Sequence, residues 1–137
     1  VEDRPPVEPL AATEHAGANL ADWVGVRAET SRVDRFVTRL AAEASASQRE
    51  RLSRGVVVLD PPRAGAGRVV VEATAALSPE TIVYVACDPV ALARDLATFR
   101  TAGYETVSVR AFDLFPHSHH VEAVAVLRRD SPPRRVM

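Results

Sequence analysis

Two short apolar runs, each followed by a polar residue and proline, constrain this chain most. Val56–Leu59 precedes Asp60 and two prolines, and Ile82–Ala86 precedes Cys87, an aspartate and a proline. Runs of this length and composition are typical of fully buried parallel strands, and proline prevents each strand from continuing. Ligands bind at the carboxyl ends of the strands in open α/β sheets. The sequence therefore predicts a carboxylate, Asp60, and a thiol, Cys87, at one edge of a sheet.

The rest of the chain alternates between helical and strand patterns, which predicts an α/β fold. Helices are expected over residues 10–21, 32–54, 69–77 and 89–102, and strands over 23–29, 56–59, 82–86, 104–111 and 121–127. Ser31 is a good N-cap for the second helix, whose middle, 41–50, is open to a loop or a weak helix. Because no helix separates the last two strands, we expect an antiparallel hairpin at one edge of the sheet. Residues 1–128 are expected to form part of one domain, and the basic tail 129–137 is expected to be disordered.

Composition excludes several classes of protein. The 137 residues suit one domain, and 47% of them are apolar, which is enough for a core. The net charge of −1 gives no global basic field that would indicate a nucleic-acid partner. One cysteine cannot form an internal disulfide and fits a reducing cytoplasm. No apolar run approaches the roughly 20 residues that span a bilayer, so we expect a cytoplasmic protein without membrane contact.

The two strand ends carry the first candidate functional residues. A lone cysteine is more often a small buried hydrophobic residue, but Cys87 lies where a helix begins, and a helix N-terminus lowers a thiol pKa. The neighbouring anion, Asp88, opposes this effect. An aspartate such as Asp60 often only caps a turn, yet with Pro61 and Arg63 beyond it, the segment favours a substrate-facing loop.

Further candidates lie near the two ends of the chain. The histidines His117, His119 and His120 invite a metal site, but no matching ligand cluster exists elsewhere in the sequence, so no metal is expected. Glu122, at the start of a strand, is either a general base or an ordinary solvated residue. Glu2 resembles the acidic residues that hold ribose hydroxyls in nucleotide-binding sheets.

In order and spacing, these pieces resemble one family. The matching motifs are Asp60-Pro-Pro-Arg-x-Gly, Tyr84-Val-Ala-Cys-Asp-Pro-x-x-Leu-Ala-Arg-Asp95-Leu, Gly103-Tyr104, and Phe112-Asp-x-Phe-Pro-His-x-x-His-Val-Glu122. Residues 1–127 resemble the C-terminal half of the S-adenosylmethionine-dependent RNA uracil-C5-methyltransferases, which make 5-methyluridine in tRNA or rRNA. The resemblance implies a partial class I methyltransferase (Rossmann-like) sheet. The family's first strand, its glycine-rich loop and its RNA-binding OB-like domain would lie before Val1.

The resemblance implies a role for each candidate. Cys87 matches the nucleophile that adds to uracil C6, and Glu122 matches the base that removes the C5 proton. The positions matching cofactor-binding residues are Glu2 and Asp60, and those assigned to substrate binding are Pro61, Arg63, Asp88 and His117. The target base would leave its stack to reach the thiol. Where the family has Ser-Cys-Asn-Pro, this chain has Ala86-Cys-Asp-Pro, and an aspartate offers only acceptors for reading uracil.

Three functions stay open at this stage. The first is an RNA uracil-C5-methyltransferase that uses S-adenosylmethionine, the second a methyltransferase acting on another base, and the third a non-catalytic Rossmann-like fragment. The strand expected beside residues 56–60 would lie before Val1. Since exposed strand edges recruit partners, we expect the chain to self-associate there, to bind cofactor weakly and to show little catalysis alone.

Overall fold

The computed structural model describes residues 9–114 and 121–130, and the chain divides into two compact units, 1–32 and 33–137. In the first unit, helix α1 (Pro9–Asn19) is followed by turns, and the hydroxyls of Thr13 and Thr30 are hydrogen-bonded. The strand predicted over 23–29 is wrong. Gly25, at φ +84°, bends the chain there. A strand needs a neighbour to satisfy its backbone groups, and no described strand pairs with this segment.

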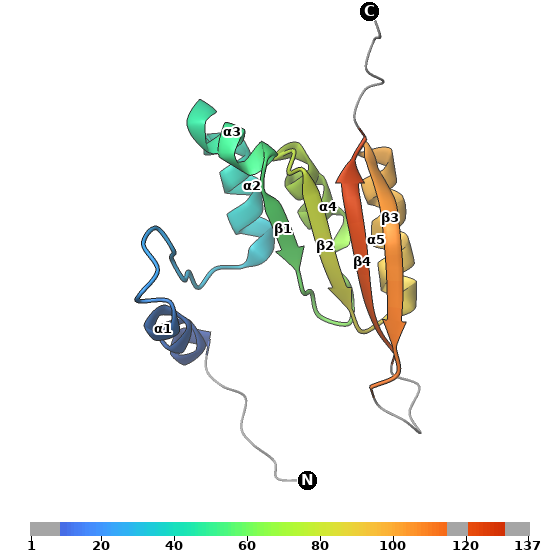
Figure 1. The fold of residues 1–137 in the computed structure, drawn as a ribbon, viewed down its shortest axis with the longest axis horizontal. Coiled ribbons are helices and arrows are strands. Elements are labelled where there is room, and N and C mark those ends of the chain that lie inside the picture. The colour runs from blue at the N-terminus through green and yellow to red at the C-terminus, as the bar shows by residue number, and fades with distance from the viewer. Residues whose placement is uncertain (1–8, 115–120, 131–137) are drawn as a thin grey trace, which may run out of the picture. The chain divides into compact units, whose positions relative to one another are not determined.

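The second unit contains a four-stranded sheet with the order β1-β2-β4-β3 (Figure 1). Its strands are β1 (Val56–Leu59), β2 (Thr81–Ala86), β3 (Tyr104–Phe112) and β4 (Glu122–Arg129). Strands β1 and β2 are parallel, whereas β4 runs antiparallel to both β2 and β3. The prediction of an antiparallel hairpin at one edge of an α/β sheet is confirmed.

Four helices accompany the sheet: α2 (Val33–Glu43), α3 (Ala46–Ser53), α4 (Gly67–Ala76) and α5 (Pro89–Thr101). The helix predicted over 32–54 is divided into α2 and α3, and the break falls in the stretch 41–50 that the sequence left open to a loop. A capping box starts α3: the Ser45 hydroxyl accepts from the Gln48 amide at 3.3 Å, and the Gln48 side chain accepts from the Ser45 amide at 2.8 Å. This reciprocal pairing satisfies amides at the start of a new helix.

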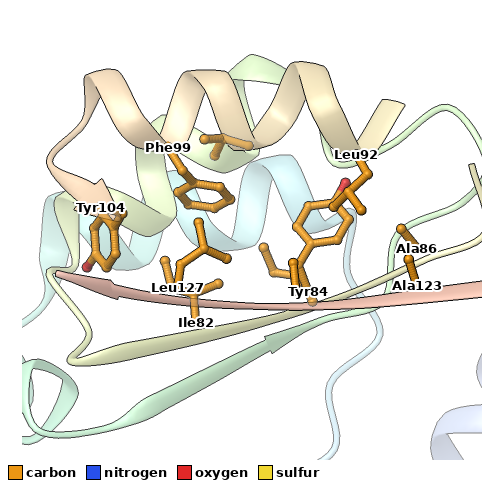
Figure 2. Packing of buried hydrophobic residues seen from close by; sticks show 11 residues of the cluster. Ile82, Tyr84, Ala86, Leu92, Phe99, Tyr104, Ala123 and Leu127 are labelled. Atoms are coloured by element: carbon orange, nitrogen blue, oxygen red, sulfur yellow. The ribbon is translucent and has the colours of Figure 1, made fainter. Parts of the chain in front are cut away.

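The core lies between the sheet and the helices α4 and α5 (Figure 2). It comprises Leu59, Val71, Ile82, Tyr84, Ala86, Leu92, Phe99, Tyr104, Ala123, Ala125 and Leu127. Buried residues alternate with half-buried ones along β2 and β4, as expected for strands covered on one face. The prediction that β1 and β2 are fully buried is therefore wrong. Val56 and Val58 are 62% and 64% exposed, because the helices of this unit cover only the opposite face.

Strand β4 ends at Arg129, so the first residue of the predicted disordered tail belongs to the sheet. The rest of that tail beyond Asp130 lies outside the described residues, as do Glu2 and His117. Within the described ranges, no helix is both long and apolar enough to cross a membrane.

Candidate active site

Asp60 and Cys87 lie at the same edge of the sheet. Asp60 directly follows β1 and Cys87 directly follows β2, and the parallel register pairs Leu59 with Tyr84. The carboxyl ends of the two strands therefore meet, which confirms the predicted placement. Asp60 is exposed and Cys87 is half-buried. Their chemical roles stay predictions.

The start of β4 brings Glu122 to this edge. In the antiparallel pairing of β2 with β4, Ala86 lies opposite Ala123. Cys87 directly follows Ala86 and Glu122 directly precedes Ala123, so both residues adjoin this pair although they are 35 residues apart in sequence. The half-buried Glu122 carboxyl and the Cys87 thiol are thus on neighbouring backbone segments.

The segment between β1 and α4 folds against the end of β2. A tight turn, closed by a 2.8 Å hydrogen bond from the Gly65 amide to the Pro62 carbonyl, reverses the chain. The recess between this segment and β2 is lined by Pro61, Pro62, Arg63, Gly65, Tyr84, Ala86, Cys87, Asp88, Ala91 and Leu92. The loop therefore lies against the Cys87 region.

Asp88 has a structural role that the family pattern did not indicate. Its Oδ1 accepts from the Ala91 amide at 2.8 Å and so caps α5. That hydrogen bond is the main reason that the pKa of Asp88 is held below its usual value. Its Oδ2 lies 3.7 Å from Nε of Arg63. A sequence signal for this cap exists, because Asp followed by proline is a typical helix start.

Behind the loop lies a fully buried carboxylate, Asp95 of α5. Its Oδ2 accepts from the Tyr84 hydroxyl at 2.6 Å, and Arg94 donates to its Oδ1 at 3.1 Å. Burial raises the pKa of Asp95, but hydrogen bonds from Tyr84, from Arg94 and from two backbone amides outweigh it and hold the pKa below its usual value. Burial, together with the bond to Asp95, raises the pKa of Tyr84. Sequence reasoning did not identify this group as part of the site.

The described residues also form a hollow away from this edge. A hollow of about 730 Å³ is lined by residues that include Arg100, Tyr104 and Asp130. It is at the opposite end of the sheet, where β3 starts and β4 ends, and contains none of the predicted site residues. Among residues 9–114 and 121–130, no group of three or more His, Cys, Asp or Glu side chains is arranged to hold a metal ion. The predicted residues Glu2 and His117 are not in these ranges.

Known proteins are similar to this chain in sequence. An RNA methyltransferase of Streptomyces avermitilis, whose own activity is uncharacterised, is 47% identical over 116 residues, which cover 85% of this chain and 25% of the relative. A similar protein of Streptomyces coelicolor is 45% identical over 116 residues, covering 85% of this chain and 23% of its own length. The chain thus spans about a quarter of these relatives.

A solved structure has a similar fold. The Pyrococcus abyssi tRNA (uracil-54, C5)-methyltransferase, in complex with S-adenosyl-L-homocysteine, superposes with a TM-score of 0.61 at 33% identity. The match covers 85% of this chain and 26% of that protein. The sequence model of the tRNA (uracil-5-)-methyltransferases matches residues 31–130, the range that contains Asp60, Cys87 and Glu122. The chain therefore belongs to the tRNA (uracil-5-)-methyltransferase family.

Proposed function

We propose that this chain carries the nucleophile and the base of an RNA methyltransferase that modifies C5 of uridine, with Cys87 as the nucleophile and Glu122 as the base. The observation that carries the proposal is the register between β2 and β4, which pairs Ala86 with Ala123, the residues next to Cys87 and Glu122, at the carboxyl edge of the sheet. A thiol and a carboxylate in this position provide the two groups that the reaction needs, at the edge where ligands bind in such sheets.

The chemistry requires both side chains in sequence. C5 of uracil is a weak nucleophile until the Cys87 sulfur bonds to C6, which turns C5 into an enolate-like carbon. After C5 has been methylated, Glu122 takes the C5 proton, the electron pair of that C–H bond restores the 5,6 double bond, and the C6–S bond breaks with release of the thiolate. The uracil is regenerated with a methyl group at C5.

S-adenosylmethionine, when bound, supplies the methyl group. Asp60 fits a cofactor contact, because it is an exposed carboxylate at the strand end next to Cys87, and Glu2 is the second proposed contact. The uridine would leave its stack to reach the thiol. Arg63, exposed beside the recess, suits a phosphate or base contact because its guanidinium offers a planar set of donors. We assign Pro61, Asp88 and His117 to the same substrate side.

The decisive assay is tritium release from RNA labelled at uridine C5, with S-adenosylmethionine present. Two proteins are compared: this chain, and a chimera in which it replaces the matched quarter of the Streptomyces avermitilis relative. We expect release from the chimera and little or none from the chain alone. Release from neither protein overturns the uracil-C5 assignment.

Two variants of the chimera separate the roles. Cys87→Ala should abolish release, because no adduct forms, and unchanged turnover would refute addition to C6. Glu122→Gln should leave addition and methylation possible but block loss of the C5 proton. We therefore expect a protein–RNA adduct that survives denaturing gel electrophoresis in Glu122→Gln and is absent in Cys87→Ala. If Glu122→Gln releases tritium at the parent rate, Glu122 is not the base.

One observation favours a second reaction within the same enzyme class. Asp88 stands where the family has asparagine. Its Oδ1 is engaged in capping α5, and its Oδ2 can only accept a hydrogen bond where an amide nitrogen would donate one. A methyltransferase acting on another base is the alternative. Methylation of RNA by the chimera without tritium release would favour it.

We also propose that β1 is a contact edge. It is the outermost strand of the described sheet, and Val56 and Val58 are largely exposed. An open apolar strand edge recruits another strand, whether from a second copy or from the rest of a longer enzyme. Light scattering should therefore find species larger than a monomer for this chain at high concentration, and a single monomer peak would refute self-association.

A further inference from the structure

We propose that Asp95, together with Tyr84 and Arg94, is a positioning group that holds the loop of residues 60–66 against Cys87. We call these three residues the Asp95 network. The proposal rests on the proposed function for its meaning in catalysis, since that function makes Cys87 the reacting residue. The structural claim, that the Asp95 network holds the loop, concerns only the described residues and is tested without RNA or cofactor.

The first support is the way in which α4 begins. The N-cap position, Ala66, has no side chain that can cap the helix, and the first amides of a helix lack partners within it. The amides of Ala66 and Gly67 instead donate to Oδ2 of Asp95 at 2.8 and 3.2 Å. A carboxylate near a helix N-terminus is also stabilised by the helix dipole. Asp95 of α5 therefore caps α4 from a different helix.

The second support is that the same carboxylate is tied to the sheet and to the loop. The Tyr84 hydroxyl donates to Asp95 at 2.6 Å and accepts from the Ala66 amide at 3.0 Å. Arg94 donates hydrogen bonds to Oδ1 of Asp95 at 3.1 Å and to the carbonyl of Ala64 at 2.7 Å. The two ends of this short stretch, Ala64 and Ala66, are thus both held by the Asp95 network.

The residue between them leaves no space for a side chain. Gly65 has φ +83°, and a Cβ atom at this position would lie 2.6 Å from both Nη2 of Arg94 and Oδ2 of Asp95. Its backbone therefore packs directly on the Asp95 network. The preceding residues, Pro61 to Arg63, line the recess with Cys87. Loss of the Asp95 network should therefore loosen the loop and expose the thiol.

A matched pair of tyrosines allows a controlled test. Tyr84 and Tyr104 are both buried and lie at opposite ends of the core (Figure 2). The Tyr104 hydroxyl donates to the Pro79 carbonyl at 2.7 Å, away from Cys87. Tyr84→Phe and Tyr104→Phe thus remove the same group from a similar environment, but only the first touches the Asp95 network. Arg94→Gln is a second test variant, because Arg94 is more than half exposed and its replacement leaves the core intact.

The readout is the rate at which iodoacetamide alkylates Cys87, the one cysteine of the chain. Rates are measured across a pH series, and the plateau at alkaline pH, where the thiol is fully ionised, reports access rather than pKa. We expect Tyr84→Phe and Arg94→Gln to raise the plateau about fivefold, the factor given by loss of a hydrogen bond of about 1 kcal/mol. Tyr104→Phe should stay at the parent plateau.

Each outcome decides the proposal. Faster alkylation in Tyr84→Phe and Arg94→Gln but not in Tyr104→Phe supports positioning by the Asp95 network. Parent-like rates in both test variants overturn it, and so do equal increases in Tyr84→Phe and Tyr104→Phe, because these would reflect general loss of stability. If Tyr84→Phe does not fold, Arg94→Gln alone decides. A failure of tritium release leaves this result untouched, so the two proposals fail independently.

Discussion

Gly65 in the loop and Gly67 at the start of α4 should respond very differently to the same substitution. Gly65 and Gly67 both have a left-handed backbone, at φ +83° and +77°, so an alanine at either position costs about 1–2 kcal/mol in backbone strain. At Gly67 a Cβ meets nothing within 4 Å, whereas at Gly65 it lies 2.6 Å from two atoms of the Asp95 network. Displacing one hydrogen bond to a charged group costs a further 1.5–3 kcal/mol or so. We expect Gly67→Ala to destabilise by about 1–2 kcal/mol and Gly65→Ala by about 2.5–5 kcal/mol.

Urea unfolding followed by circular dichroism measures this difference. Fluorescence is a poor probe, because the one tryptophan, Trp23, is 68% exposed and belongs to the other compact unit. Gly67→Ala is the control for backbone strain, since it keeps the amide that donates to Asp95. Equal losses of stability in the two variants, or a larger loss in Gly67→Ala, would refute the claim that the loop backbone packs on the Asp95 network.

Two further predictions concern carboxylates. Because the folded state lowers the pKa of Asp95, its stabilising effect is present above its ordinary value of 3.8 and is lost as the pH falls below it. Asp95→Asn should therefore be less stable than the parent at neutral pH and lose less stability on acidification, as thermal melts across an acid pH series would show; parallel curves would contradict this. Asp88→Asn should keep the cap of α5, since an amide oxygen can also accept from Ala91, and so melt near the parent temperature, while Asp88→Ala melts lower. A large loss in Asp88→Asn would mean that the contact with Arg63 matters more than the cap.

The strands around the site could be predicted from the sequence because their signals are local. Each apolar run is bounded by a polar residue and proline, and the parallel pairing of β1 with β2 follows from the α/β alternation. The predicted strand over 23–29 failed because an alternating pattern describes only one strand, whereas pairing needs a second. The break in the helix predicted over 32–54 falls in the stretch 41–50 that the sequence left open to a loop, and the Ser45 and Gln48 capping box marks where α3 begins.

The edge position of Asp60 and Cys87 was predictable for the same reason, but the place of Glu122 was not derivable from residues alone. A glutamate at the start of a strand has no preferred partner. Only the sheet order, which inserts β4 between β2 and β3, brings the start of β4 beside the end of β2 that precedes Cys87. The family resemblance implied a role for each of the two residues. The pairing of β2 with β4 explains how their segments, which are distant in sequence, meet.

The Asp95 network shows what a sequence can indicate and where it stops. Leu92, Asp95 and Phe99 are spaced three and four residues apart, so the carboxylate lies on the apolar side of α5, and all three are buried. A charge on that side predicts a buried ion, and buried ions require partners. Those partners come from a β2 hydroxyl, a neighbouring arginine and amides nearly 30 residues away at the start of α4. Because amides are present at almost every residue, no side-chain pattern marks the ones that a carboxylate will cap. The sequence therefore indicates that Asp95 needs a partner, whereas only the fold shows that Asp95 holds the loop beside Cys87.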